Sequence, residues 1–400
     1  MIRMASVEQA LGLIADHGAR RVTGLESVPL AAALGRRLAE PVLARVSQPP
    51  AAVSAMDGYA VRFADMKLGA SLRVVGESRA GTPFGGEVAS GEAVRIFTGA
   101  HVPPGADHVL IQEDARREGD AVAVTFEQPQ AANIRRAGRD FSAGDTLVPS
   151  GLMVSEGAIS LAAAGNNPRL IVAKAPRIGV LANGDELVSA GDDLALGQIV
   201  NSIQPALLAL IRRWGAVALD LGLSRDTEED VRARIRAPCD VIVSIGGASV
   251  GDYDIVRTAF AAEGFAPVFE KIAVKPGKPT WFSSAKSALA LGLPGNPAAA
   301  MVTAQLFLKP LIDALTGGAP EAGPISRAAT ATALPATGNR EEYLRAVLSI
   351  GEDGAASIRA AEDQDSSLLS PFLSANALIR RPVNAPGVGA GALVDYIPLR

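Results

Sequence analysis

Apolar and polar positions in the middle of the chain follow two alternating periods. Residues 177–181 and 241–245 are short apolar runs, the second rich in β-branched residues, as is typical of buried parallel strands. Between them, residues 203–214 carry apolar side chains at helical spacing, and Gly215 follows. Strands and helices that alternate in this way predict a doubly wound parallel sheet, which binds ligands beyond the carboxyl ends of its strands.

The flanking regions have shorter patterns. Ser6 and Gln9 form a capping box at the start of a predicted helix. From residue 53 to 127, β-leaning runs alternate with Gly, Pro and Asp turns, which indicates a small inserted β domain, and residues 321–400 indicate a terminal β-barrel. We therefore expect a multidomain α/β chain with an α/β domain (1–24 and 173–318), a linker domain (25–50 and 138–172), the inserted β domain (51–137) and a C-terminal β-barrel domain (319–400).

Composition limits the possible functions. The 400 residues, 48% of them hydrophobic, are enough for several cores. A net charge of -4 gives no electrostatic reason to expect nucleic acid as a partner. With one cysteine and three histidines at no zinc-ligand spacing, any metal should be bound by oxygen. Because the start has no signal-peptide core and no stretch reaches membrane-spanning length without charge or proline, we expect a cytoplasmic protein with no membrane partner.

Three segments adjoin plausible strand or helix ends, where unpaired backbone N–H groups can hold an anion; they are residues 244–254, 275–279 and 293–297. In the first, Gly246 and Gly247 let a bulky group approach the backbone, and Ser249 adds a hydroxyl donor. Asp252 and Asp254 bring carboxylates to the same loop, so a phosphate there implies Mg²⁺ or a similar hard cation. The alternative for this segment alone is a glycine-rich turn with solvated acids.

Lysines mark the second segment. Lys275 and Lys278 flank a Pro-Gly turn, and alternation over residues 269–274 predicts a strand that carries Lys271 to the same edge. Three ammonium groups suit an anionic substrate, although a solvated basic turn remains the alternative. In the third segment, Pro297 suits the first position of a helix that runs to residue 315, and this helix start is a further anion site.

Several longer motifs join these three loops in order along the chain; they are residues 54–61, 95–100 and 133–140. With them, nearly the whole chain resembles the molybdopterin molybdotransferases, whose architecture also includes the E domain of gephyrin. The resemblance implies an α/β domain of the molybdopterin-binding type, an elongated linker domain and a C-terminal β-barrel. It further implies that the protein takes adenylylated molybdopterin and molybdate, uses Mg²⁺, and releases AMP and the molybdenum cofactor.

The resemblance also implies roles for individual residues. The implied catalytic residues are Asp57, Thr98, Asp140, Glu186, Asp226, Asp254, Lys271 and Lys275. The implied substrate-binding residues are Gly246, Gly247, Ser249, Asp252, Lys278, Pro294, Gly295, Asn296, Pro297, Arg345 and Ser366. Glu186, Asp254 and Asp185 are the implied metal ligands. For Asp226, facing the pterin and capping its helix are equally open. Because the family's active site is similar to a cleft shared between subunits, we expect a homodimer in which Asp57 and Thr98 act across the interface.

Two positions depart from the family pattern. Asn183 stands where Ser or Thr is common before Gly-Asp-Glu, and Ile245 replaces a hydroxyl residue before Gly246. The acids and lysines remain, so the implied reaction class is unchanged. Two alternatives stay open. The α/β segment alone is similar to the adenylyltransferase that activates molybdopterin, against which the β domains argue. The other is a gephyrin-like interaction scaffold, which would not need so many charges at one edge.

Overall fold

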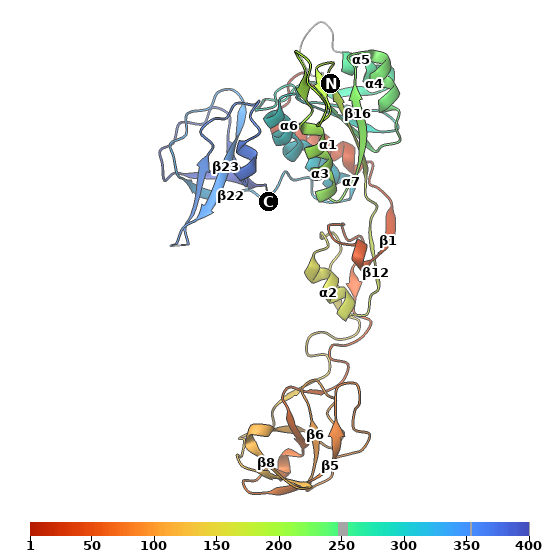
Figure 1. Ribbon diagram of the computed structural model, residues 1–400, viewed down its shortest axis with the longest axis vertical. Helices are drawn as coiled ribbons and strands as arrows, with labels where there is room; N and C mark the ends of the chain where they lie inside the picture. The colour runs from red at the N-terminus through yellow and green to blue at the C-terminus, as the bar shows by residue number, and fades with distance from the viewer. Residues whose placement is uncertain (247–254, 353, 400) are drawn as a thin grey trace. The chain divides into compact units, whose positions relative to one another are not determined.

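The computed structural model describes residues 1–246, 255–352 and 354–399. The chain forms two compact units (Figure 1). The first comprises Met1–Glu26, Gly35–Arg37 and Val172–Arg400, and the second comprises Ser27–Leu34 and Leu38–Ile171. The finer boundaries of four domains stay a prediction.

A six-stranded sheet in the order β16-β13-β17-β21-β20-β18 organises the first unit. The four strands β16 (Val217–Ser224), β13 (Arg177–Asn183), β17 (Val241–Ile245) and β21 (Leu289–Leu293) are parallel, as predicted. At one edge, however, β20 (Trp281–Ser284) and β18 (Ala266–Phe269) run antiparallel. The reason is the short turn between β20 and β21, closed by a bond from Ala285 N to Ala288 O, because a parallel pair needs a much longer crossover.

Helices cover both faces of this sheet. One face buries α1 (Val7–Ala19), α3 (Ile203–Arg213) and the long helix after β21, and the other buries α4 (Glu228–Ile235) and α5 (Ile255–Ala262). The predicted capping box is present at α1: Ser6 Oγ accepts a hydrogen bond from Gln9 N at 3.1 Å, and Ser6 N donates to Gln9 Oε1 at 3.0 Å. The doubly wound arrangement is thus confirmed.

The long helix consists of α6 (Pro297–Thr303), a π-helical segment (Ala304–Leu308) and α7 (Lys309–Leu315). Its length and apolar composition would suffice to cross a membrane, but 83% of the relevant window is buried inside the protein. Its apolar residues belong to the main core cluster of the sheet. It therefore has the burial of a core helix.

The C-terminal strands close on themselves. They are β22 (Ser326–Thr330), β23 (Glu341–Ile350), β24 (Ala356–Ala360), β25 (Ala377–Arg381) and β26 (Leu393–Pro398). Because β23 pairs with both β24 and β25, the ring closes, and the predicted barrel is confirmed. The short strand β19 (Val274–Lys275) adds to β23 in parallel, with Lys275 opposite Glu342. The lysine turn is therefore attached to the barrel. Helix α8 (Pro371–Ser374) precedes β25.

The second unit contains the predicted small β domain, a sheet in the order β7-β4-β6-β5-β9-β8. Its strands are β4 (Gly58–Val61), β5 (Ser71–Ser78), β6 (Glu92–Ile96), β7 (His108–Ile111), β8 (Ala115–Glu118) and β9 (Ala121–Val124).

Short elements flank this β domain along the chain. They are β1 (Leu25–Pro29), β2 (Val42–Leu43), β3 (Val53–Ser54), β10 (Ile134–Arg135), β11 (Thr146–Val148), α2 (Glu156–Ala164) and β12 (Arg169–Ala173). The 3-10 turns are Leu30–Ala32, Phe63–Asp65 and Gln112–Asp114, of which the last two lie within the β domain.

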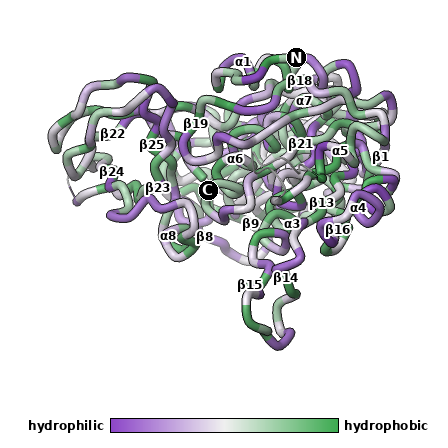
Figure 2. The backbone as a smooth tube through the Cα atoms, turned by 90° about the horizontal axis from the view of Figure 1, so that it is seen from above, coloured by the Kyte–Doolittle hydropathy of each residue, from purple (hydrophilic) through white to green (hydrophobic). Residues whose placement is uncertain are grey.

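A two-stranded ribbon leaves the sheet of the first unit after β13. It pairs β14 (Leu187–Val188) with β15 (Ile199–Val200) in parallel, and Figure 2 shows it extending away from the rest of its unit. Ile199 N donates to Glu186 O at 2.8 Å, so the base of the ribbon is tied to a predicted site residue.

Candidate active site

A cavity of about 1330 Å³ lies where the parallel strands end, and the first unit alone lines it. The loops after β13, β16, β17 and β21 meet there, together with the lysine turn and the C-terminal barrel. The predicted site residues that line it are Glu186, Asp226, Gly246, Lys275, Lys278, Pro294, Gly295, Asn296, Pro297 and Ser366. The lysine turn, the segment after β21 and the described start of the segment after β17 therefore line one cavity, and the two segments that follow parallel strands meet at the edge that the strand pattern predicts.

Asn183 ties the strand ends together beneath the cavity. Its side chain is 4% exposed. Its Oδ1 accepts a hydrogen bond from Ser224 Oγ at 2.6 Å, and its Nδ2 donates to Ser244 Oγ at 2.7 Å and to Ile245 O at 3.2 Å. Gly246 follows with φ +84, and a Cβ there would lie 2.7 Å from Asn183 O, so this turn requires glycine.

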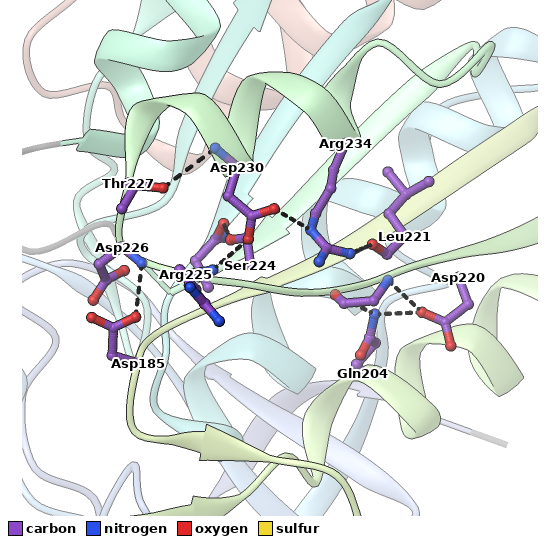
Figure 3. A network of polar contacts seen from close by, with 12 residues as sticks. Asp185, Gln204, Asp220, Leu221, Ser224, Arg225, Asp226, Thr227, Asp230 and Arg234 are labelled. Atoms are coloured by element: carbon purple, nitrogen blue, oxygen red, sulfur yellow. Dashed lines mark hydrogen bonds and ion pairs between the residues drawn. The ribbon is translucent and has the colours of Figure 1, made fainter.

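The loop after β16 answers the question about Asp226 (Figure 3). Thr227 is the residue that caps α4, because its Oγ1 accepts from Asp230 N at 3.3 Å. Asp226 lines the cavity, and its N donates to Asp185 Oδ1 at 3.1 Å. Asp185 itself does not line the cavity, so its carboxylate positions the backbone at Asp226.

A second carboxylate steadies the same loop from the side of α4 (Figure 3). Asp230 Oδ2 accepts from Arg225 N at 2.8 Å, and Arg234 Nε donates to Asp230 Oδ1 at 3.2 Å. The Arg225 backbone N–H, and then Arg234, lower the pKa of Asp230 below its usual value. The loop that carries Asp226 is thus held by charged partners on both sides.

The lysine turn is fixed by close packing. Gly277 has φ +118, and a Cβ there would lie 2.2 Å from Thr303 Cγ2 of α6. Thr280 Oγ1 donates to Gly277 O at 2.8 Å. Lys275 Nζ lies 3.2 Å from Glu342 Oε1. For the Lys278 side chain, the described part of the chain offers no ion pair, and Lys278 lines the cavity.

Lys271 does not join the other two lysines in the cavity. The strand predicted over residues 269–274 is not continuous, because β18 ends at Phe269 and β19 begins at Val274. In between, the backbone turns to the N-terminal segment: Lys271 O accepts from Ala5 N at 2.9 Å.

Arg345 also lies behind the cavity wall and does not line it. Its side chain is 1% exposed and donates to the carbonyl oxygens of Leu368 (2.8 Å), Asp363 (3.2 Å) and Asp365 (2.9 Å). A buried guanidinium satisfied by carbonyls shapes the loop that carries Ser366. Arg345 is therefore not among the residues that line the cavity, contrary to the contact predicted for it.

The barrel adds cavity residues that sequence reasoning missed, chiefly Arg340, Tyr343 and Asp365. Burial, followed by the nearby Glu341 carboxylate, raises the pKa of Tyr343, whose hydroxyl donates to Glu341 Oε1 at 2.8 Å. Asp365 Oδ1 accepts from Ser367 N and Oγ, which lowers the pKa of Asp365. The position of Arg340 directly before a strand was the available signal, because strand ends present side chains at a sheet edge.

Three predicted residues belong to the second unit. Asp57 Oδ1 accepts from Thr98 N at 2.7 Å and from Thr98 Oγ1 at 2.8 Å, and these bonds lower the pKa of Asp57. Thr98 thus orients the Asp57 carboxylate and favours its ionised form. Asp140 is exposed, and its N donates to Gln48 O at 2.9 Å. The two bonds between Asp57 and Thr98 bring together residues that are far apart in sequence.

Gly247, Ser249, Asp252 and Asp254 lie outside the described residues. Among the residues that are described, no three His, Cys, Asp or Glu side chains gather as a metal site. The described carboxylates that line the cavity are Glu186 and Asp226 on the strand-end loops and Asp365 on the barrel side.

Comparison with known proteins agrees with this geometry. The MoeA N-terminal region (domain I and II) matches residues 5–165, the probable molybdopterin binding domain matches residues 179–314, and the MoeA C-terminal region (domain IV) matches residues 327–399. The molybdopterin molybdenumtransferase of Haemophilus influenzae is 34% identical over 381 residues, which cover 94% of each chain. The chain belongs to the MoeA family of molybdopterin molybdenumtransferases.

Other MoeA relatives support the assignment. The molybdopterin molybdenumtransferase of a Nostoc species is also 34% identical, over 94% of this chain and 89% of that protein. The crystal structure of the MoeA protein from Pyrococcus horikosii aligns with a TM-score of 0.82 at 26% identity and covers 100% of both chains. The resemblance inferred from the motifs and the predicted multidomain fold are therefore confirmed.

Proposed function

We propose that this MoeA protein inserts molybdenum from molybdate into adenylylated molybdopterin and releases AMP. One observation carries the proposal: a single cavity joins a carboxylate edge, Glu186 and Asp226, to a cationic wall, Lys275, Lys278 and Arg340. A polyanionic substrate and a second oxyanion can meet only where cations offset their repulsion. The names of the relatives identify the substrate class.

The cationic wall suits molybdate, a tetrahedral dianion. Lysine acts as a point charge toward such an anion, and arginine adds a planar fork of donors. Lys275 already pairs with Glu342 at 3.2 Å, whereas Lys278 and Arg340 have no ion pair within the described part of the chain. Lys278 and Arg340 are therefore the cations that can pair with the oxyanion without first breaking an ion pair within the protein. Ser366 lines the same cavity.

The carboxylate edge fits Mg²⁺. This ion is usually bound by one or two carboxylates together with substrate phosphates, so Glu186 and Asp226 are a sufficient protein donor set. Bound there, Mg²⁺ would neutralise charge on the pyrophosphate. Asp185 keeps Asp226 in place through its backbone N–H, and Ile199 N fixes the backbone of Glu186 through its carbonyl oxygen.

The reaction balances without a redox partner. The two dithiolene sulfurs bind molybdenum while one oxo group leaves as water with the two thiol protons, so molybdenum keeps its oxidation state. Cleavage of the phosphoanhydride adds the elements of one water and releases AMP. The protein's task is to position and neutralise the reactants, which suits a rigid strand edge.

We also propose a homodimer. Asp57 and Thr98 form a preorganised pair in the second unit, and a second copy of the chain is the partner that would bring this pair to the cavity. The acidic net charge and the burial of the long apolar helix Pro297–Leu315 support a cytoplasmic protein that binds neither nucleic acid nor membrane.

A single-turnover assay tests the proposal. Purified protein is mixed with adenylylated molybdopterin, molybdate and Mg²⁺, and both AMP release and molybdenum retained on the pterin are followed. We expect AMP release that depends on molybdate, with metal-loaded pterin as product. Adenylylation of free molybdopterin with ATP, without molybdate-dependent AMP release, would contradict the proposal and assign the preceding step.

A further inference from the structure

We infer that Asn183 is a positioning residue that holds the carboxylate edge of the cavity in register; the inference rests on the proposed function. Asn183 is the last residue of β13, between β16 and β17 in the sheet. A side chain at the end of β13 can therefore reach both neighbouring strands. The Asn183 amide bonds to Ser224 of β16 on one side and to Ser244 and Ile245 of β17 on the other.

The amide has no N–H left to donate to a ligand. Both Nδ2 hydrogens are donated, at 2.7 Å to Ser244 Oγ and at 3.2 Å to Ile245 O, and Oδ1 accepts from Ser224 Oγ at 2.6 Å. Although Asn183 borders the cavity, its polar atoms are directed into the strand ends. It therefore acts through other residues.

Each of its partners leads to a cavity loop. Ser224 precedes Asp226 by two positions, Ile245 precedes Gly246, and Asn183 itself precedes Glu186 by three positions. Ser224 is 2% exposed and Ser244 is 0% exposed. Loss of the amide would leave both hydroxyls buried with fewer partners, which costs more than a bond at the surface. The strand ends would separate, and Glu186 and Asp226 would lose their relative placement.

The departure from the family pattern follows from this geometry. Ser or Thr has one hydroxyl hydrogen and could not satisfy Ser244 Oγ and Ile245 O together. An aspartate would place a second carboxylate oxygen against Ile245 O. Asparagine alone among residues of this size offers an acceptor and two donors. Asn183 is thus matched to the serines at 224 and 244 of this chain.

The cationic wall provides a contrast. Lys275 ends β19, Lys278 lies on the turn that follows, and Arg340 lies directly before β23. The hydrogen bonds of the Asn183 side chain go to Ser224, Ser244 and Ile245, which lie outside these segments. Loss of Asn183 should slow turnover and leave molybdate binding unchanged. A general loss of stability would instead lower both the turnover rate and the affinity for molybdate.

The experiment compares Asn183→Leu and Asn183→Ser with the unmodified protein and with Asn167→Ser. The control residue is also a buried asparagine, whose Nδ2 donates to Leu43 O and Gly165 O in the second unit. Three quantities are measured: the single-turnover rate of AMP release, the Kd for molybdate by calorimetry, and amide hydrogen exchange over residues 184–187 and 225–227.

For Asn183→Leu we expect about 100-fold slower AMP release, because a small misplacement of acting groups has effects of that order. The molybdate Kd should stay within about twofold, and exchange in both loops should rise at least about tenfold. Asn183→Ser should be intermediate, and it decides the matter if Asn183→Leu does not fold. Asn167→Ser should change none of the three.

Unchanged exchange in the two loops, or an equal loss of turnover and molybdate affinity, would overturn the inference. Failure of the proposed function gives a different result, since the unmodified protein would then release no AMP with molybdate. The exchange measurement still judges the positioning role in that case.

Discussion

Asn296 Nδ2 donates a hydrogen bond of 2.7 Å to Ser366 Oγ, and this bond joins the start of α6 to a loop of the C-terminal barrel. A second bond runs from Ala298 N to Ser366 O at 2.9 Å. Ser366 thus uses one of the N–H groups that a helix start leaves unpaired. The barrel is therefore part of the wall of the cavity, and Ser366 joins it to the start of α6.

Ser366→Ala should weaken molybdate binding by about three- to tenfold, the equivalent of one net hydrogen bond. The bond from Ala298 N to Ser366 O remains, so the thermal midpoint should change little. Calorimetric titration with molybdate measures the effect. Ser374→Ala, which removes an exposed hydroxyl on α8, is the control. Equal affinities in the two variants would refute the role of Ser366.

Asp226→Asn and Thr227→Ala should affect different properties: the first should lower the rate of AMP release, and the second should lower the stability of the fold. Thr227 caps α4, so its loss should lower the free energy of unfolding by about 1 kcal/mol and leave turnover nearly intact. Asp226 lines the cavity and caps nothing, so Asp226→Asn should keep the stability and slow AMP release by about 100-fold. Chemical denaturation and the single-turnover assay measure the two properties. The reverse assignment of effects would show that Asp226 has a structural role.

Lys278→Met should raise the Kd for molybdate at least about tenfold, because a charged donor at the cavity is lost. Lys286→Met, at an exposed position outside the cavity, is the matched control. The effect should shrink as salt is added, since screening weakens an exposed charge. A salt-independent difference would contradict an electrostatic role.

Gly277→Ala should destabilise the lysine turn by about 1–3 kcal/mol, because the backbone at φ +118 is unfavourable for alanine and the added methyl meets Thr303. Thr303→Ser removes the methyl it would meet. The double variant should therefore recover part of the thermal midpoint that Gly277→Ala loses, while the backbone strain persists. No recovery would mean that the strain alone accounts for the loss.

Local chemistry made much of this structure predictable. The capping box at Ser6, Pro297 at the first position of α6, and the β-leaning runs around Val94 and Val122 all depend on short-range patterns, and the structure has each of them. The gathering of Glu186 and Gly295 at one edge followed from the parallel arrangement of β13, β17 and β21, since parallel strands end at the same edge.

What could not be predicted depends on contacts distant in sequence. The buried Arg345 looks like an anion contact until the carbonyls of residues 363–368 are seen around it. Lys271 fell outside the cavity because its backbone pairs with Ala5, over 260 positions away in the sequence numbering. That Asp226 does not cap α4 is known only from the bond that Asp230 N donates to Thr227 Oγ1, and no periodicity specifies that bond.

Acid should remove one specific contribution to stability, the pairing of Glu263 with Arg232 and Arg236. Arg236 donates from Nε and Nη2, and Arg232 donates from Nε at 2.8 Å. Hydrogen bonds from Arg236 and then Arg232 lower the pKa of Glu263 from 4.5 to about 2. The folded carboxyl thus binds a proton less readily than the unfolded one. The stabilisation is complete above the unfolded pKa and is lost as the pH falls from about 4.5 to about 2.

Glu263→Gln isolates this contribution. The thermal midpoint of the unmodified protein should exceed that of Glu263→Gln by a constant amount above about pH 5, and the difference should shrink steadily at lower pH. Glu229→Gln, an exposed position on α4, should show no such trend. A difference that persists unchanged down to about pH 3 would mean that the amide fails to keep the packing of Glu263, and that charge is not what the two arginines supply.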